Sequence, residues 1–211
     1  MLKRQNSSEG AGRNLPEALP SCDTTLLQLS FTASRAKERE LDALVAQLYR
    51  DELGIGVVQP DAGKCSFHRV LVAEHDGVVV AGLKAYVAGA GFAEALPTEL
   101  EGVPISDYHA RRFGPDSPYC EVCRVVVSKA YRQFDMQRRL IDFVTDYLQG
   151  IGCPACYWFA NRVQTLGSHR VVRSLDGRPE VLGVVTVNRG GGCRELYWSC
   201  VAVWPALCGS E

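Results

Sequence analysis

Residues 119–139, YCEVCRVVVSKAYRQFDMQRR, concentrate side chains that can move protons and bind anions. Glu121 lies among apolar and β-branched residues, which favour a β-strand over 119–128. A carboxyl group held among apolar neighbours has a raised pKa and suits a general base near neutral pH. We therefore predict Glu121 as the catalytic base, with Arg124 either orienting it or binding a substrate carboxylate. The alternative is an exposed glutamate on a strand edge, paired with Arg124.

Three arginines surround the expected start of the next helix. Arg132 precedes Asp135, a suitable N-cap residue, and Arg138 and Arg139 follow it. A helix N-terminus offers unpaired amide groups and the positive end of the helix dipole, so it attracts phosphate. Arginine adds bidentate contacts to phosphate oxygens. The pattern predicts a phosphate site, unless these arginines are only the solvated face of a basic helix.

Two CxxC pairs raise the separate possibility of metal or redox chemistry: Cys120 with Cys123, and Cys153 with Cys156. A spacing of three along a strand sends the first pair to opposite faces, and a long helix separates the two pairs. Thioredoxin-like motifs open a helix after a strand, whereas CPAC follows a helix and enters a strand. We therefore expect packed thiols and no metal, with a zinc-stabilised interaction domain as an alternative.

The elements that must position these residues follow from hydrophobic periodicity. Strands are predicted, in chain order, at 25–33, as a hairpin within 68–87 that turns at His75-Asp76-Gly77, and at 119–128, 156–160, 180–188 and 195–204. Helices are predicted after the caps Ser34 and Asp135 and in the 160s, with a long loop and a short helix over 88–118. This order predicts a single α/β (α+β) domain over 23–211, preceded by a flexible leader over 1–22.

Composition limits the functional classes. The 211 residues are 46% hydrophobic and 22% charged, with a net charge of -1, so nothing in the overall charge favours nucleic acid. No stretch approaches the roughly 20 apolar residues that span a bilayer, and the start lacks the apolar run of a secretory signal. Nine cysteines, an odd number, fit reduced thiols. We expect a cytoplasmic protein that binds neither nucleic acid nor membrane, as a monomer or homodimer.

The hairpin VLVAEHDGVVVAGLKAY and the segment VVVSKAYRQFDMQRRLIDFV resemble the GNAT acyltransferase superfamily. The resemblance implies a central mixed, mostly antiparallel twisted sheet flanked by helices on both faces. It also implies that a pantetheine pyrophosphate binds an Arg/Gln-x-x-Gly-x-Gly/Ala loop that opens a helix. Arg132 is present, but Gln133, Asp135 and Gln137 stand where the common pattern has glycines. The implied cofactor contacts are Val125, Val126, Val127, Arg132, Gln133, Gln137, Arg138 and Arg139.

A subgroup is more similar. LYRDELGI, EALPTEL and EVCRVVV resemble N-acyl amino acid synthases and the related acyl-homoserine lactone synthases, whose Glu-x-Ser-Arg motif reads Glu121-Val122-Cys123-Arg124 here. These relatives lack the glycine-rich loop too, and many take the acyl group from an acyl-carrier protein. The acid-rich segment of the lactone synthases is not apparent, so lactone chemistry is the weaker expectation.

The reaction implied is transfer of an acyl group from acyl-CoA, or from the acyl-phosphopantetheine of a carrier protein, to a primary amine. The acceptor would be an amino acid, a small amine or a peptide side chain. His169 is a candidate general acid, because the family's tyrosine position falls near Ser168 and His169; it could instead be a solvated loop histidine. Cys123 is a less favoured covalent nucleophile.

An acidic carrier protein would dock on Arg132, Arg138 and Arg139, with Arg111 and Arg112 as further candidates. The competing hypothesis is a non-catalytic module of the same fold that binds a thioester or another metabolite.

Overall fold

The computed structural model describes residues 27–54, 68–89, 95–100, 102–188 and 194–204. One sheet of seven strands organises them, in the order β1-β2-β3-β4-β5-β7-β6. All neighbours are antiparallel except β4 and β5, which are parallel. The mixed, mostly antiparallel sheet is therefore confirmed, whereas the leader at 1–22 lies outside the described residues. The strands are β1 Gln28–Thr32, β2 His68–His75, β3 Val78–Ala88, β4 Tyr119–Val127, β5 Ala155–Asn161, β6 Arg178–Asn188 and β7 Arg194–Val203.

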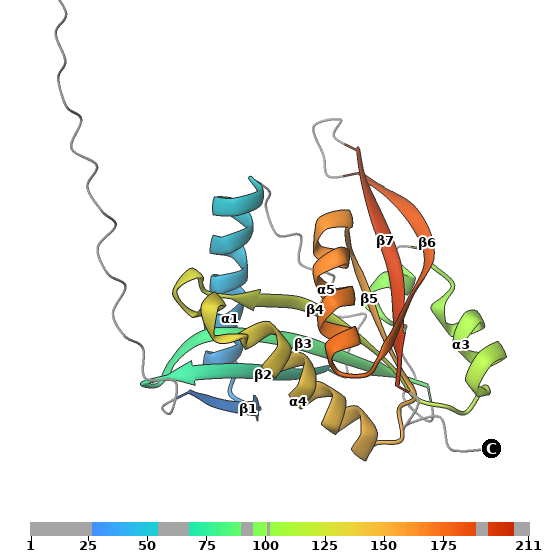
Figure 1. Ribbon diagram of the computed structural model, residues 1–211, viewed down its shortest axis with the longest axis horizontal. Helices are drawn as coiled ribbons and strands as arrows, with labels where there is room; N and C mark the ends of the chain where they lie inside the picture. The colour runs from blue at the N-terminus through green and yellow to red at the C-terminus, as the bar shows by residue number, and fades with distance from the viewer. Residues whose placement is uncertain (1–26, 55–67, 90–94, 101, 189–193, 205–211) are drawn as a thin grey trace, which may run out of the picture.

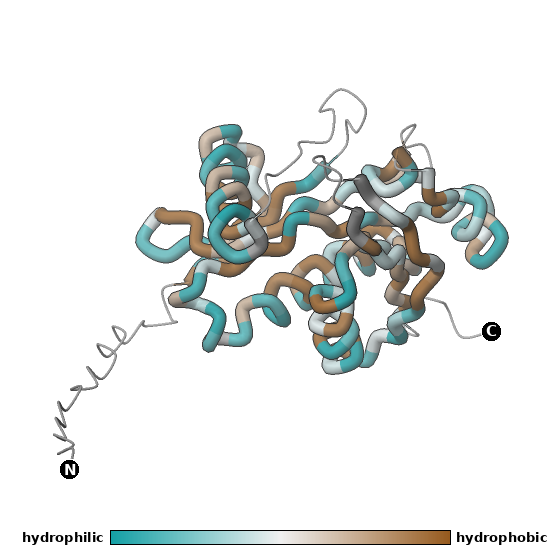
Figure 2. Tube along the Cα trace, turned by 90° about the horizontal axis from the view of Figure 1, so that it is seen from above, coloured by the Kyte–Doolittle hydropathy of each residue, from teal (hydrophilic) through white to brown (hydrophobic). Residues whose placement is uncertain are grey.

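Helices cover both faces of the sheet, as Figures 1 and 2 show. Helix α1 (Arg35–Leu48) buries Leu41, Val45 and Leu48 on one face. Helices α4 (Met136–Gly150) and α5 (Arg162–Ser174) pack on the other face. In Figure 2 the hydrophobic segments lie mainly in the strands between the helix layers. In the described part of the chain, no helix has the length and apolar character needed to cross a membrane.

Local sequence explains several boundaries. Ser34 caps α1, because its side chain accepts a hydrogen bond from the Lys37 amide. Asp76 and Gly77 join β2 to β3 with φ of 52° and 76°, the geometry of a tight hairpin turn. Asp135 precedes α4 as predicted, but its φ is 53° and its side chain makes no capping hydrogen bond. Asp135 is therefore the N-cap residue by position, as predicted, and its carbonyl accepts from the Arg139 amide at 3.1 Å, but its side chain does not cap the helix.

The segment before β4 is more ordered than the predicted loop. It contains two helices, α2 (Pro97–Leu100) and α3 (Ile105–Phe113). Ile105 and His109 of α3 are buried, and His109 Nδ1 lies 2.8 Å from the hydroxyl of Tyr157 on β5. The segment thus closes over the sheet on the face opposite α4 and α5, and it contributes Thr98 to the surroundings of Glu121.

Candidate active site

A bulge in β4 opens the sheet at its centre. Gly82 of β3 pairs with Val126, but Lys84 pairs with Cys123, so Arg124 and Val125 together oppose one residue. Arg124 adopts a φ of 56°, a left-handed conformation that is uncommon for arginine. A bulge bends its strand, and within the described residues β4 pairs with β5 only at Cys120–Cys156 and Glu121–Tyr157. Beyond that point the two parallel strands separate.

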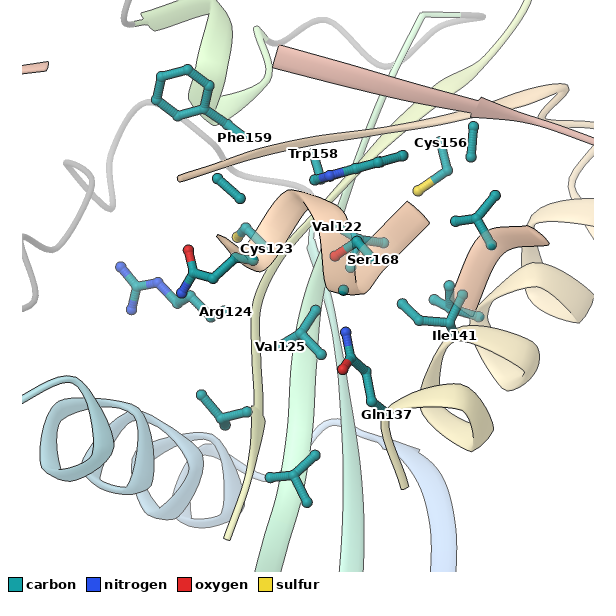
Figure 3. A pocket seen from close by; sticks show the side chains of 18 of the residues that line it. Val122, Cys123, Arg124, Val125, Gln137, Ile141, Cys156, Trp158, Phe159 and Ser168 are labelled. Atoms are coloured by element: carbon teal, nitrogen blue, oxygen red, sulfur yellow. The ribbon is translucent and has the colours of Figure 1, made fainter. Parts of the chain in front are cut away.

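A cavity of about 500 Å³ occupies the gap between β4 and β5 and continues beneath α4 and α5. Its volume suits a small organic ligand. One part, the polar end, is lined by Tyr49, Glu52, Arg124, Arg132 and Gln137. The other part, the apolar end, is lined by Val122, Ile141, Val144, Cys156 and Val172. Figure 3 shows Arg124 on one side of this space, Ile141 and Cys156 on the other, and Gln137 between Arg124 and Ile141.

Only some of the residues predicted to bind the cofactor lie at the cavity. Val125, Val126, Val127, Arg132 and Gln137 line the cavity. Gln133, Arg138 and Arg139 do not line it.

Arg132 donates hydrogen bonds to the carbonyl of Val127 at 3.1 Å and to Glu52 at 2.6 Å. Glu52 belongs to a π-helical turn, Tyr49–Leu53, that continues α1. The arginine at the pattern's first position is therefore already paired with an acid. Arg138 is likewise 3.6 Å from the carboxylate of Asp135.

The arginines proposed for protein docking do not form one surface. Arg112 lies on α3 and binds Glu180 of β6 through two contacts of 2.7 and 2.9 Å. In Figure 1, α3 and the start of α4 lie at opposite sides of the molecule. Arg111 and Arg112 are therefore separated from Arg132, Arg138 and Arg139.

Glu121 is buried on the other face of β4, where its side chain is 2% exposed. Its carboxylate accepts hydrogen bonds from the Thr98 amide at 2.9 Å and from the Thr98 hydroxyl at 2.5 Å. Burial raises the pKa of Glu121 to about 7, although the bonds from Thr98 oppose this rise. The alternative of an exposed glutamate paired with Arg124 is wrong. Glu121 does not itself line the cavity.

Arg124 belongs to a separate ionic cluster under α1. Its guanidinium lies 3.2 Å from Asp42, which is also 3.1 Å from the buried Lys84. Lys84 pairs in turn with Glu38 at 2.7 Å, and Glu38 contacts His68 at 3.0 Å. Each charge in this cluster has an opposite partner, which is the condition for burying charge without a large penalty. Arg124 therefore contacts Asp42 of α1, and no ion pair joins it to Glu121.

His169 is not on a loop: it lies in α5 and is 9% exposed. Its ring packs edge-on against Trp158, with centroids 5.6 Å apart. Burial and the nearby Arg173 lower its pKa. His169 does not line the cavity, but the preceding residue, Ser168, does, and Figure 3 shows it there.

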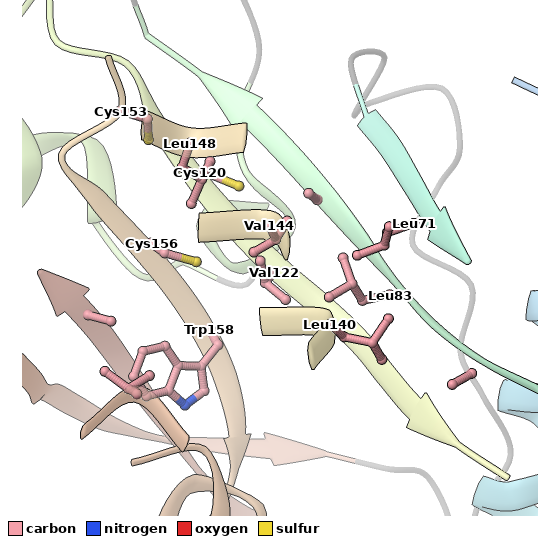
Figure 4. Close-up of a cluster of buried hydrophobic side chains, with 14 of the residues drawn as sticks. Leu71, Leu83, Cys120, Val122, Leu140, Val144, Leu148, Cys153, Cys156 and Trp158 are labelled. Carbon is pink, nitrogen blue, oxygen red and sulfur yellow. The ribbon is translucent and has the colours of Figure 1, made fainter. Parts of the chain in front are cut away.

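The thiols pack as a group in the core. Cys120, Cys153 and Cys156 are buried beside Leu148 and Val144 of α4, as Figure 4 shows. Cys120 belongs to this core, whereas Cys123 packs against the opposite face.

The pKa of Cys120 is raised by a hydrogen bond with Cys156 and by burial, and burial raises the pKa of Cys153 to about 12. Burial therefore favours the protonated form of both thiols. In the parts of the chain described, no cluster of three or more His, Cys, Asp or Glu residues could hold a metal ion.

Sequence reasoning assigned no role to several residues that shape the site. Glu52, Gln164 and Gly167 line the cavity, and Thr98 binds Glu121. Glu52 and Thr98 occur within LYRDELGI and EALPTEL, so a motif signal existed for both. Nothing in the local sequence indicates that Gly167 lines a cavity, because the sequence of a helix does not show which elements pack beside each of its residues.

Solved structures of other proteins share this fold. No family model and no curated protein matches the sequence. Among solved structures, FeeM, an N-acyl amino acid synthase from uncultured soil microbes, is similar with a TM-score of 0.62 and 14% identity, over 84% of this chain and 90% of that one. NAA60 of Arabidopsis thaliana in complex with acetyl-CoA gives 0.56 and 16%, over 83% and 97%. A putative phosphinothricin N-acetyltransferase gives 0.54 and 17%, over 88% and 99%. The chain therefore has the fold of the GNAT acyltransferases.

Proposed function

We propose that the protein is an N-acyltransferase that moves an acyl group from a thioester to a primary amine. The observation that carries this proposal is the opening between β4 and β5. Separated parallel strands lead into a cavity of about 500 Å³ that has a polar end near the start of α4 and an apolar end in the core. An elongated ligand with a polar arm and an apolar tail matches this division.

The fit suggests how the donor lies. The phosphate-bearing arm of a pantetheine, on CoA or on a carrier protein, would meet Arg132 and Gln137 at the polar end. The acyl chain would enter the apolar end, where Val122, Ile141 and Val144 exclude water. The thioester then lies along β4 between the two ends, close to the bulge at Arg124. Holding amine and thioester together would supply a large part of the rate enhancement.

The chemistry needs a neutral amine, because an ammonium ion has no lone pair for attack. Glu121 is the base in this proposal, since a pKa of about 7 lets its carboxylate accept a proton near neutral pH. The amine nitrogen forms a bond to the thioester carbon, and the carbon–sulfur bond breaks. The products are an amide and a thiol. Because Glu121 does not line the cavity, the amine proton would have to reach it through the gap between β4 and β5, and would then pass to the departing thiolate or to solvent.

Stabilisation of the oxyanion is assigned to backbone amides of β4 near the bulge. A strand that has separated from its neighbour can turn N–H groups toward a ligand in the gap. The candidates are Val125, Val126 and Val127, which all line the cavity. We assign no step to His169, whose ring packs against Trp158.

Turnover tests the proposal directly. Purified protein is incubated with thioesters of two to sixteen carbons, presented on CoA and on the phosphate-free thiol N-acetylcysteamine, together with amino acids and small amines. Thiol release is followed by colour development, and products are identified by mass spectrometry. We expect release that depends on the amine and yields an N-acyl product. Release that is the same without amine would contradict the proposal.

A non-catalytic thioester-binding module is the second candidate. Two observations favour it: Glu121 is sealed beneath Thr98, and Ser168 stands near the position where this superfamily often has a tyrosine acid. Tight thioester binding without thiol release across the whole panel would establish this candidate.

A further inference from the structure

Acidic side chains stand where a phosphate-binding site needs positive charge. The carboxylate of Glu52 is 2.6 Å from Arg132 and 3.9 Å from Lys129, so one acid serves both cations. Glu52 lines the cavity, and its side chain is 28% exposed, less than the 46% of Arg132. Single π-helical turns often occur at functional sites, and this one carries both Tyr49 and Glu52 into the polar end.

Asp135 adds a second acid at the start of α4. It has a φ of 53°, the left-handed conformation that glycine adopts most easily. The backbone geometry is therefore the one a glycine would supply, but a carboxylate is attached to it. That carboxylate pairs with Arg138 at 3.6 Å. Asp135 and Arg138 therefore offset each other, and of the charged residues that line the polar end Arg124 and Arg132 are positive and Glu52 is negative, which leaves a net charge of one.

We propose that Glu52, assisted by Asp135, is a specificity residue that favours a donor with a single phosphodiester over free CoA. This inference rests on the proposed function and refines its donor. The pyrophosphate of CoA carries two negative charges and its ribose phosphomonoester adds about two more. The phosphodiester that joins pantetheine to a carrier protein carries one. A site with one net positive charge matches the second donor, and each further phosphate charge is repelled by Glu52 and Asp135.

Equilibrium binding of three unacylated compounds tests the inference by calorimetry: pantetheine, 4′-phosphopantetheine and CoA. They share the pantetheine arm and differ in phosphate charge: pantetheine has none, the phosphomonoester 4′-phosphopantetheine carries about two negative charges near pH 7, and CoA carries about four. The variant is Glu52→Gln, which keeps the shape of the side chain and removes its charge. The matched control is Glu40→Gln on the exposed face of α1, where Glu40 pairs with Lys37 at 3.1 Å outside the cavity.

We expect the unaltered protein to bind 4′-phosphopantetheine more tightly than CoA. Glu52→Gln should tighten CoA binding about fivefold, the effect of removing one close repulsive charge, and change pantetheine binding less than twofold. Glu40→Gln should leave all three affinities unchanged. The gain for CoA should shrink as salt is raised, because added ions screen the repulsion.

Two results would overturn the inference. The first is tighter binding of CoA than of 4′-phosphopantetheine by the unaltered protein. The second is weaker CoA binding by Glu52→Gln, which would mean that Glu52 holds Arg132 in place for phosphate. If none of the three compounds binds, the proposed function fails as well. If pantetheine binds but Glu52→Gln leaves the preference unchanged, only the inference fails.

Discussion

The two faces of β4 differ sharply around the same few residues. On the face toward α2 and α3, Glu121 is 2% exposed and bonded twice to Thr98. On the face toward α4 and α5, the next residue, Val122, borders a cavity of about 500 Å³. Side chains alternate along a strand, so consecutive residues enter different environments. An acid with a raised pKa and a space for a substrate can therefore be built one residue apart.

The comparison shows that a proton can pass between Glu121 and the cavity only at a gap in the sheet. Glu121 does not line the cavity, but it stands at the last residue of β4 that pairs with β5, next to the point where the two strands separate. The bulge at Arg124 is what produces that separation, because it bends β4 away. We call the face of β4 with Glu121 the closed face and the face with the cavity the open face. The following predictions test whether both faces take part in one reaction.

The largest effect is expected from Glu121→Gln. If the closed face supplies the base, this variant should lower kcat/KM about 100- to 10,000-fold. In the unaltered protein, kcat/KM should rise with pH up to about 7, the pKa of Glu121, and this rise should vanish in the variant. The measurement is a pH profile of amine-dependent thiol release. An unchanged profile would separate Glu121 from the reaction.

The same substitution should change how stability depends on pH. The pKa of Glu121 is about 7 in the folded protein against 4.5 in the unfolded chain, so the folded state holds the proton more strongly. Stability from this group is therefore complete below pH 4.5 and is lost as the pH rises to about 7, by about 3 kcal/mol in total.

Urea unfolding of both proteins between pH 4.5 and 8 measures this term. The difference between them isolates Glu121, because all other groups titrate alike. Parallel curves for the two proteins would show that the carboxyl is not held in a dry site.

On the open face, Gly167→Leu should block the cavity. A Cβ added at Gly167 meets nothing within 4 Å, and this residue lines the space. We expect thioester binding to weaken about tenfold, with a gain in helix stability of about 0.5–1 kcal/mol because glycine disfavours helices.

Gly150→Leu is the control, since Gly150 ends α4 outside the cavity and its added Cβ also meets nothing. Calorimetry gives the affinities and thermal unfolding gives the stabilities. Equal binding by both variants would show that the ligand does not pass Gly167.

The smallest effect is expected from Asp135→Gly at the polar end. Asp135 and Asp176 both have positive φ, 53° and 59°, so replacement by glycine should relieve similar strain at each, within about 1 kcal/mol. Only Asp135→Gly should also tighten CoA binding, about twofold, because it removes a carboxylate beside Arg138. Asp176→Gly is the control, and equal CoA affinities would contradict the acidic character assigned to this end.

Much of the framework was predictable because it depends on near neighbours in the chain. The hairpin at Asp76-Gly77, the cap at Ser34 and the helical spacing of Leu140, Val144 and Leu148 are local signals, and the structure contains each of them. The raised pKa of Glu121 also followed from its apolar neighbours. These features need little information from distant residues.

Other features depend on contacts across the sequence. Glu121 meets Thr98, 23 positions earlier, and Arg132 meets Glu52, 80 positions earlier. A helix in the 160s was predicted, but the burial of His169 against Trp158 was not, because it depends on how α5 packs on β5. The left-handed conformation of Arg124 could not be inferred, since arginine has no preference for it.

The amino-acid order by itself therefore determined the strands, the helices and an acid in an apolar run, because backbone preferences and burial patterns act over a few residues. Tertiary structure decided that β4 bends away from β5, that Glu121 is sealed beneath Thr98, and that Glu52 neutralises Arg132. Those arrangements depend on packing and ion pairs between residues that are far apart in the chain. No short stretch of sequence contains both partners.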